Sequence, residues 1–265
     1  QLREAGIKAF YVANDCKGGR LPGIPSENAE GVSAAVDFLR RVAEQKAKGG
    51  AADPMHGRTI VVGGGNVAID VARTAARLGS EHVEMFCLES SEDMPASTEE
   101  VMEANEDGVH ISCGWGPVEV RCGEDGRVNE VSVKRCLLVF NDEGLFDPQY
   151  DENETRTVSA DRVVFSIGQS IVWGDLLAGS AVELGRGQGA VADPKTYQTA
   201  QPDIFVGGDV YTGPKFAIDA IAAGHEAAVS LHRFVQNATL TIGRNQRSYR
   251  ELNKDDVEFG SYDTA

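Results

Sequence analysis

The chain has 265 residues, of which 42% are hydrophobic and 25% charged, and this composition is typical of a globular protein with one or two domains. It contains no run of about 18 apolar residues, which argues against a membrane-spanning helix. The net charge of −16 argues against a broad surface for nucleic acid or anionic lipid, because such surfaces need an excess of Lys and Arg.

The N-terminal part of the chain predicts a strand, a loop and a helix. Residues 7–13 are an apolar run typical of a strand. Residues 16–25 contain three Gly and two Pro residues and predict a loop. Apolar residues at helical spacing predict a helix over residues 33–48, and a linker follows it up to Pro54.

A strand–helix–strand unit begins after this linker. Residues 59–62 form a short apolar run of the kind found in buried parallel strands. Three glycines end this strand, and the next apolar pattern predicts a helix over residues 66–78. The following strand is predicted over residues 82–88, so the segment has the length of a βαβ unit.

The hydrophobic period then changes from that of helices to that of exposed strands. A helix over residues 98–107 and a strand over residues 109–112 continue the α/β alternation. Alternating residues around the turn at Asp125-Gly126, a long strand through residues 131–140 and a return from Val158 predict a small antiparallel meander.

The last third of the chain predicts two strands and one long helix. The strands are expected over residues 161–167 and 203–206, and the helix over residues 216–235. The polar remainder, residues 237–265, predicts an irregular tail. The predicted fold class is therefore α/β, with a parallel sheet of the Rossmann type and a small antiparallel meander.

The most informative motif is the glycine-rich turn before the second predicted helix. Residues 63–68 read Gly-Gly-Gly-Asn-Val-Ala and match G-x-G-x-x-A between a strand and a helix, the setting that dinucleotide binding requires. Gly63 permits the tight turn, Gly65 lets the backbone approach a pyrophosphate, and Ala68 allows close contact between helix and strand. Asn66 and Val67 open the helix, whose free N–H groups favour phosphate.

Glu89 indicates which dinucleotide the turn prefers. It ends the next strand, 21 residues after Ala68, where a carboxylate would accept hydrogen bonds from the adenosine ribose. A carboxylate repels a 2′-phosphate, and Leu88, Ser90 and Ser91 carry no positive charge. We therefore expect NAD(H) to be preferred over NADP(H), although an Arg from elsewhere in the chain could reach this position.

A second strand–turn–helix motif lies in the last third of the chain. Residues 203–209 end in Gly207-Gly208-Asp209, and a helix is predicted after Lys215. Asp209 would suit a ligand with hydroxyl groups near a helix N-terminus. The alternative is that Asp209 only caps the chain turn.

Other catalytic patterns are absent or poorly placed in the sequence. Tyr211 and Lys215 have the spacing of a short-chain dehydrogenase pair, but Gly213-Pro214 between them opposes a continuous helix. The five histidines have no metal-ligand spacing, and no catalytic acid, base or nucleophile stands out. The five cysteines form no C-x-x-C pair, which favours thiols in a reducing, cytoplasmic setting.

Residues 61–73, Met94-Pro95-Ala96 and residues 204–209 together resemble the glutamate synthase small-subunit family of pyridine-nucleotide flavoproteins. The resemblance extends from Phe10 to about Val235. It implies an NAD(P)H domain inserted in an FAD domain, with hydride transfer between NAD(P)H and FAD and onward electron transfer to an iron–sulfur domain or subunit.

The resemblance also implies a domain plan. Residues 1–55 would be a remnant of the FAD domain with a linker helix, and residues 56–167 the NAD(P)H domain. Residues 168–236 would be the C-terminal part of the FAD domain, before the tail. The implied cofactor-binding residues are Gly63, Gly65, Asn66, Val67, Ala68, Glu89, Gly168, Gly208, Asp209, Phe216 and Ala217.

The chain departs from the family pattern in three places. It holds one dinucleotide fingerprint where the family has two, which predicts a fragment that lacks the first half of the FAD site. Leu88 and Glu89 replace the Arg pair of NADPH-preferring members, and Asn14-Asp15 replaces a glycine. The alternative function is a nucleotide-binding module without catalysis of its own. The oligomeric state and the final electron acceptor stay open.

Overall fold

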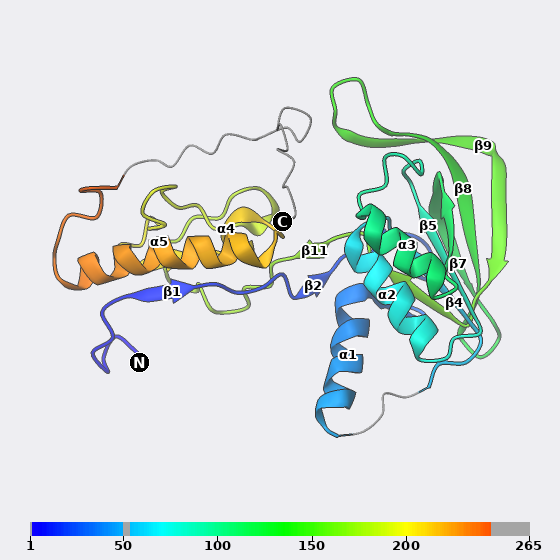
Figure 1. Ribbon diagram of the computed structural model, residues 1–265, viewed down its shortest axis with the longest axis horizontal. Helices are drawn as coiled ribbons and strands as arrows, with labels where there is room; N and C mark the ends of the chain where they lie inside the picture. Colours follow the sequence, from blue (N-terminus) through cyan, green and yellow to red (C-terminus); the bar gives the residue numbers. More distant parts are fainter. Residues whose placement is uncertain (1, 50–53, 245–265) are drawn as a thin grey trace, which may run out of the picture. The chain divides into compact units, whose positions relative to one another are not determined.

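A computed structural model describes residues 2–49 and 54–244 of the chain (Figure 1). These residues form two compact units. The sheet unit comprises residues 14–177 and 186–189, and the terminal unit comprises residues 2–13, 178–185 and 190–244 among those described. Within them, no helix has the length and apolar character needed to cross a membrane.

A five-stranded sheet is the framework of the sheet unit. Its strand order is β3-β10-β4-β5-β6, and all neighbouring pairs are parallel. The crossover helices between parallel strands account for the alternation of helical and strand patterns in the sequence. The strands are β3 (Val32–Ala34), β4 (Arg58–Val62), β5 (His82–Cys87), β6 (His110–Cys113) and β10 (Arg162–Phe165).

Three helices cover one face of this sheet: α1 (Ala35–Ala47), α2 (Asn66–Arg77) and α3 (Thr98–Glu106). Their apolar residues pack with Val61, Met85 and Val164 in one buried cluster. Helix α3 begins at Ser97, whose hydroxyl accepts a hydrogen bond from the Glu100 N–H and caps the helix.

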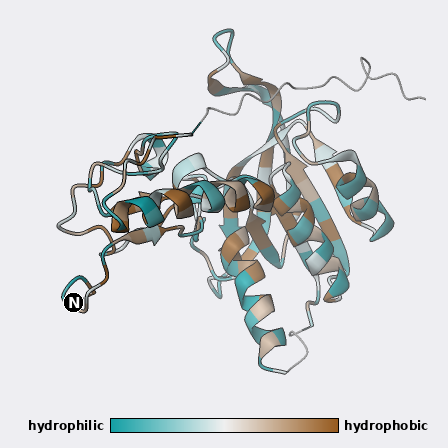
Figure 2. Cartoon of the chain, turned by 60° about the vertical axis from the view of Figure 1, so that its left-hand side comes forward, coloured by the Kyte–Doolittle hydropathy of each residue, from teal (hydrophilic) through white to brown (hydrophobic). Residues whose placement is uncertain are grey.

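An antiparallel meander covers the opposite face. It consists of β7 (Trp115–Cys122), β8 (Val128–Phe140) and β9 (Phe146–Ser159) in that order, as the alternating pattern predicted. Ile60 and Val62 of β4 pack against its valines in a second cluster. Residues 59–62 of β4 are buried, which explains why they read as a continuous apolar run. Several strands of the sheet unit are largely brown in Figure 2.

The sheet unit begins well before residue 56, where the sequence analysis expects the NAD(P)H domain to start. Residues 14–49 cluster with this unit and not with residues 2–13. The reason is pairing: β3 joins the sheet beside β10, and α1 packs on α2. Strands β2 (Gly18–Gly19) and β11 (Gln169–Ser170) also pair, which brings residues 168–177 into the same unit.

The terminal unit contains two short parallel strands and a long helix. Strand β1 (Phe10–Val12) pairs with β12 (Ile204–Val206), and helix α5 (Ala217–Val235) packs on both. The ring of Phe205 meets that of Phe234 edge to face, with centroids 5.8 Å apart. The short helix α4 (Asp209–Thr212) lies between β12 and α5 in the chain.

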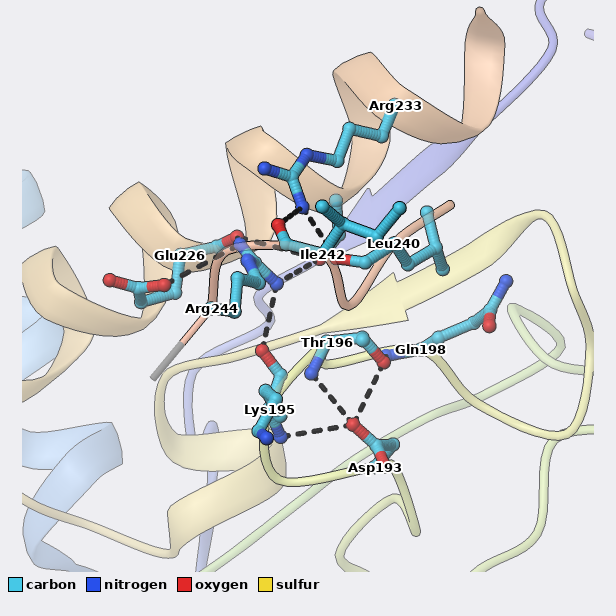
Figure 3. Close-up of polar contacts among 10 residues, drawn as sticks. Asp193, Lys195, Thr196, Gln198, Glu226, Arg233, Leu240, Ile242 and Arg244 are labelled. Atoms are coloured by element: carbon cyan, nitrogen blue, oxygen red, sulfur yellow. Dashed lines mark hydrogen bonds and ion pairs between the residues drawn. The ribbon is translucent and has the colours of Figure 1, made fainter. Parts of the chain in front are cut away.

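Arg244 ties the segment after α5 back to the terminal unit (Figure 3). Its guanidinium donates to the carbonyl of Lys195 at 2.8 Å and to the hydroxyl of Ser230 at 2.6 Å, and it pairs with Glu226. The beginning of the predicted tail is therefore packed on α5. Residues 245–265 lie outside the described residues.

Candidate functional site

The glycine-rich turn follows β4 and forms a backbone that other residues could not adopt. Gly63 has φ +143°, in the region that favours glycine, and its N–H donates to the Phe86 carbonyl at 2.8 Å. A Cβ at Gly63 would lie 2.2 Å from the Ser166 carbonyl oxygen. The turn therefore packs closely between the carboxyl ends of β5 and β10.

The middle glycine of the turn makes room for Glu89. A Cβ at Gly64 would lie 2.9 Å from the Glu89 carboxylate and 3.0 Å from the Cys87 Cβ. The Gly64 carbonyl accepts a hydrogen bond from the Ala96 N–H at 3.0 Å. The carboxylate predicted to bind ribose thus lies directly beside the turn predicted to hold the pyrophosphate.

The start of α2 is open on the side of Gly65. A Cβ there would meet nothing within 4 Å, and Gly65 is the N-cap of the helix. The backbone N–H groups of the first turn of a helix lack partners within the helix and attract anions. Ala68 is fully buried against the sheet, as close helix–strand packing requires.

Asn66 and Val67, the other predicted residues of this turn, have structural contacts as well. The Asn66 side-chain oxygen accepts a hydrogen bond from the Ser97 N–H at 2.9 Å, which ties α2 to the cap of α3. Val67 packs against the helix-side core. What they offer a ligand is therefore their backbone N–H groups.

A cavity of about 750 Å³ adjoins Glu89, within the range of small-molecule sites. Its walls are the segment after β5, the end of β6 and the C-terminal half of β8. Arg135 of β8 lines it, and the guanidinium donates to the Cys113 carbonyl at 3.3 Å and lies over the Trp115 ring at 5.7 Å. The cavity walls therefore carry two carboxylates, those of Glu89 and Asp93, and one guanidinium.

Gly114 contacts both the backbone of Glu89 and the side chain of Arg135. Its N–H donates to the Glu89 carbonyl at 2.8 Å, while a Cβ at this residue would lie 3.0 Å from the Arg135 guanidinium. The φ of +75° also favours glycine here. Arg135 is an arginine from a distant part of the chain that lines the same cavity as Glu89, and its position depends on the pairing of the meander.

Three thiols lie close to the same cavity. Burial raises the pKa of the Cys87 thiol, and the neighbouring Cys113 raises it further. Burial also raises the pKa of Cys136, with Glu89 adding to the effect. The five cysteines, all within the described residues, form no disulfide. Protonated thiols are poor nucleophiles, so the raised pKa values make Cys87 and Cys136 less reactive than ordinary thiols.

Gly168 lies near the same edge of the sheet but outside the turn. It has φ +113° and is exposed, and its carbonyl accepts a hydrogen bond from the Arg20 N–H at 3.2 Å. It connects β10 to β11 and follows Ser166, whose carbonyl lies against Gly63.

The remaining predicted residues belong to the terminal unit. Gly208 is buried with φ +64°, and it is the N-cap of α4, which begins at Asp209. A Cβ at Gly208 would meet only the Ala220 Cβ, at 3.8 Å. Phe216 and Ala217, at the start of α5, are both exposed.

The structure thus brings Gly63, Gly65, Asn66, Val67, Ala68 and Glu89 together at one sheet edge. Gly208, Asp209, Phe216 and Ala217 form a separate group in the other unit. Sequence reasoning missed Gly64, Gly114 and Arg135. A third consecutive glycine was a signal for Gly64, but nothing in the sequence pairs Arg135 with Glu89.

A profile described as pyridine nucleotide-disulphide oxidoreductase matches residues 18–224. The chain belongs to this family. The sequence resemblance to pyridine-nucleotide flavoproteins and the predicted α/β fold are both confirmed.

Curated relatives of the chain are named as subunits of NADPH- or NAD-dependent enzymes. The chain is 32% identical over 230 residues to the glutamate synthase [NADPH] small chain of Escherichia coli, covering 81% of this chain and 48% of the relative. It is 32% identical over 216 residues to the NAD-dependent dihydropyrimidine dehydrogenase subunit PreT of the same organism, covering 82% and 45%. The chain thus spans about half the length of these relatives.

Solved structures share the fold at low identity. FprA of Mycobacterium tuberculosis in complex with NADPH has a TM-score of 0.69 at 18% identity, covering 94% of this chain and 68% of that one. Thioredoxin reductase of T. acidophilum has a TM-score of 0.64 at 18% identity, covering 87% and 66%. Both similarities concern the fold alone.

Proposed function

We propose that the sheet unit binds NAD(H) and serves an FAD-dependent oxidoreductase that passes electrons to an iron–sulfur domain or subunit. The observation that carries the proposal is the position of the Glu89 carboxylate beside Gly64, next to the open start of α2. This arrangement offers N–H donors to a pyrophosphate and an acceptor to a ribose. The relatives of the chain support the rest of the proposal, since their names include NAD- and NADPH-dependent enzymes.

The residues present fit a dinucleotide. Gly65 leaves the space in front of the α2 N-terminus open, and the cavity beside Glu89 has the volume of a small-molecule site. In this arrangement Gly63 holds the turn, Asn66 and Val67 donate backbone N–H groups to phosphate, and Ala68 keeps α2 close to the sheet. Glu89 accepts hydrogen bonds from the ribose hydroxyls, which favours NAD(H).

The terminal unit has features that fit part of an FAD site. The buried Gly208 leaves room for a ligand at its backbone, and Asp209 follows it with a carboxylate suited to hydroxyl groups. At the start of α5, Phe216 and Ile218 are 76% and 68% exposed, and an apolar ring system would cover them. Gly208, Asp209 and the start of α5 would hold FAD, which would supply the hydride acceptor and the one-electron chemistry, so the proposal requires no catalytic acid or base from the chain.

Gly65→Ala tests the nucleotide site without disturbing the fold. Gly65 has φ −91°, which alanine adopts, and an added Cβ meets no protein atom within 4 Å. The same Cβ would occupy the space of the pyrophosphate, so we expect NADH to bind at least about tenfold more weakly, which is about 1.4 kcal/mol. Isothermal titration calorimetry measures this affinity.

The control for Gly65→Ala is Glu81→Ala, an exposed residue just beyond the far end of α2. It should leave both NADH affinity and the thermal midpoint unchanged. Unaltered NADH binding by Gly65→Ala, with both variants folded, would contradict a pyrophosphate at this turn.

The second candidate is a nucleotide-binding module without catalysis of its own. The sheet unit is compact by itself and contains the glycine turn, Glu89 and the cavity, which favours independent binding. Flavin absorbance in the purified chain, and its bleaching by NADH, distinguishes an oxidoreductase from such a module.

A further inference from the structure

A second cavity, of about 340 Å³, lies at the opposite end of the parallel strands from the glycine turn. Arg162, which lines it, is the first residue of β10 and pairs with Thr59, whereas the glycine turn follows the opposite end of β4. The cavity is therefore separate from the proposed nucleotide site, at the amino ends of the strands.

Three arginines from different elements converge on this cavity. Arg41 comes from α1, Arg127 from the turn between β7 and β8, and Arg162 from β10. One carboxylate, that of Glu30, also lines it and pairs with Arg127. The charged residues that line the cavity therefore carry a net charge of +2.

Arg162 is the residue whose environment needs an explanation. Its Nη1 is closed off from solvent and has no hydrogen-bond partner within the described part of the chain. Burial lowers the pKa of Arg162, and the charges of Arg41 and Arg127 lower it further, against the opposing effect of Asp161. The Asp161 carboxylate also accepts a hydrogen bond from the Arg58 N–H at 2.8 Å.

Ser33 provides a second buried polar group without a hydrogen-bond partner. Its hydroxyl is closed off from solvent and lacks a partner among the described residues, and Ser33 lines the cavity too. A buried donor without a partner costs about 1–3 kcal/mol, and more when it is charged. Unpaired buried groups that share one cavity commonly mark a missing ion or water.

We propose that this cavity is a binding site for a phosphate group, held by Arg41, Arg127 and Arg162. A phosphate dianion balances the two excess positive charges among the residues that line the cavity. The planar guanidinium matches phosphate oxygens in pairs, which makes arginine a preferred phosphate ligand. Phe38, Val42 and Leu78 form an apolar wall that can take the organic part of a phosphate monoester.

Thermal unfolding with inorganic phosphate tests the site. Phosphate is titrated against NaCl at matched ionic strength, so that a general salt effect cancels. We expect a saturable rise in the thermal midpoint of the wild type, about 3–5 °C at ten times the dissociation constant. Arg162→Gln should lose this rise and weaken phosphate binding at least about tenfold by calorimetry.

Two further variants complete the test. Arg41→Gln changes an exposed residue, so it folds even if Arg162→Gln does not, and it should also weaken phosphate binding. Arg121→Gln is the matched control, because Arg121 is exposed on β7 and pairs with Glu119 away from the cavity. It should keep the full response. Equal midpoints in phosphate and NaCl, or an undiminished response in Arg162→Gln or Arg41→Gln, would overturn the proposal.

Discussion

At the scale of single residues, the nucleotide site combines opposite charges from distant parts of the chain. Glu89 follows β5, and Arg135 lies 46 positions later on β8, yet both line one cavity. A carboxylate favours the free ribose hydroxyls of NAD(H), whereas a guanidinium favours a 2′-phosphate. Under the proposed function, the preference between the two dinucleotides would depend on both residues.

We expect wild-type protein to bind NADH more tightly than NADPH, and Glu89→Gln to reverse this order. Loss of the carboxylate removes the repulsion, and Arg135 is already present to meet the phosphate. The shift in relative affinity should be about 1–3 kcal/mol, the scale of charged hydrogen bonds. Parallel titrations with NADH and NADPH measure it.

The double variant Glu89→Gln/Arg135→Gln is the control for this reversal. It should lose most of the NADPH affinity that the single variant gains, since no cation then faces the 2′-phosphate. Tighter binding of NADPH than NADH by the wild type would refute the proposed preference.

Alanine substitutions at Gly63 and Gly65 should have different effects on the free energy of unfolding. Gly63→Ala forces a Cβ to within 2.2 Å of the Ser166 carbonyl at φ +143°, whereas Gly65→Ala meets no atom within 4 Å. We expect Gly63→Ala to lower the free energy of unfolding by at least about 2 kcal/mol and Gly65→Ala to change it little. Urea denaturation of both variants checks this, and equal stabilities would contradict it.

At the scale of elements, a cluster of charges joins two of the helices on the sheet. Arg73 of α2 donates a hydrogen bond of 2.8 Å to the carboxylate of Asp107, which lies at the C-terminal end of α3. Arg73 also forms an ion pair with Glu103. This hydrogen bond from Arg73 lowers the pKa of Asp107, and Arg77 lowers it further. Their interaction therefore contributes to stability when Asp107 is ionised.

The pH dependence of this contribution follows from the direction of the shift. Because the pKa is lower in the folded state, the contribution is complete above about pH 4, the ordinary pKa of Asp, and is lost as the pH falls through the lowered value. The gap in thermal midpoint between wild type and Asp107→Asn should be constant above about pH 5 and shrink below about pH 4. A gap that persists unchanged to pH 3 would contradict this assignment.

Element positions were mostly predictable because each has its own hydrophobic period. The helix expected over residues 66–78 is α2, Asn66–Arg77, and the meander follows the alternating segments. The N-terminal boundary was not predictable, because β3 is only three residues long. Its membership of the sheet depends on pairing with β10, about 130 positions away.

At the scale of the whole molecule, the two units carry different parts of the proposed function. The 265 residues contain one dinucleotide fingerprint, and it lies in the sheet unit. A second glycine turn with its helix dipole would supply much of the binding energy for the FAD phosphates. We therefore expect this polypeptide to bind NAD(H) but to hold FAD weakly.

Gel filtration after incubation with excess FAD measures this difference. The protein peak should lack stoichiometric flavin absorbance while still binding NADH by calorimetry. A longer form of the protein that carries a second fingerprint should retain FAD and reduce it with NADH. Stoichiometric flavin on the 265-residue chain would show that the FAD-binding residues proposed here suffice.

The sequence by itself determined the α/β class, the glycine turn and the carboxylate after the second strand of the βαβ unit. These depend on residues within about 30 positions, and local periodicity and spacing encode them directly. Only the tertiary structure decided that Arg135 faces the Glu89 cavity and that Arg41, Arg127 and Arg162 share another. Strand pairing and helix packing bring such residues together, and no local pattern records a contact between distant charges.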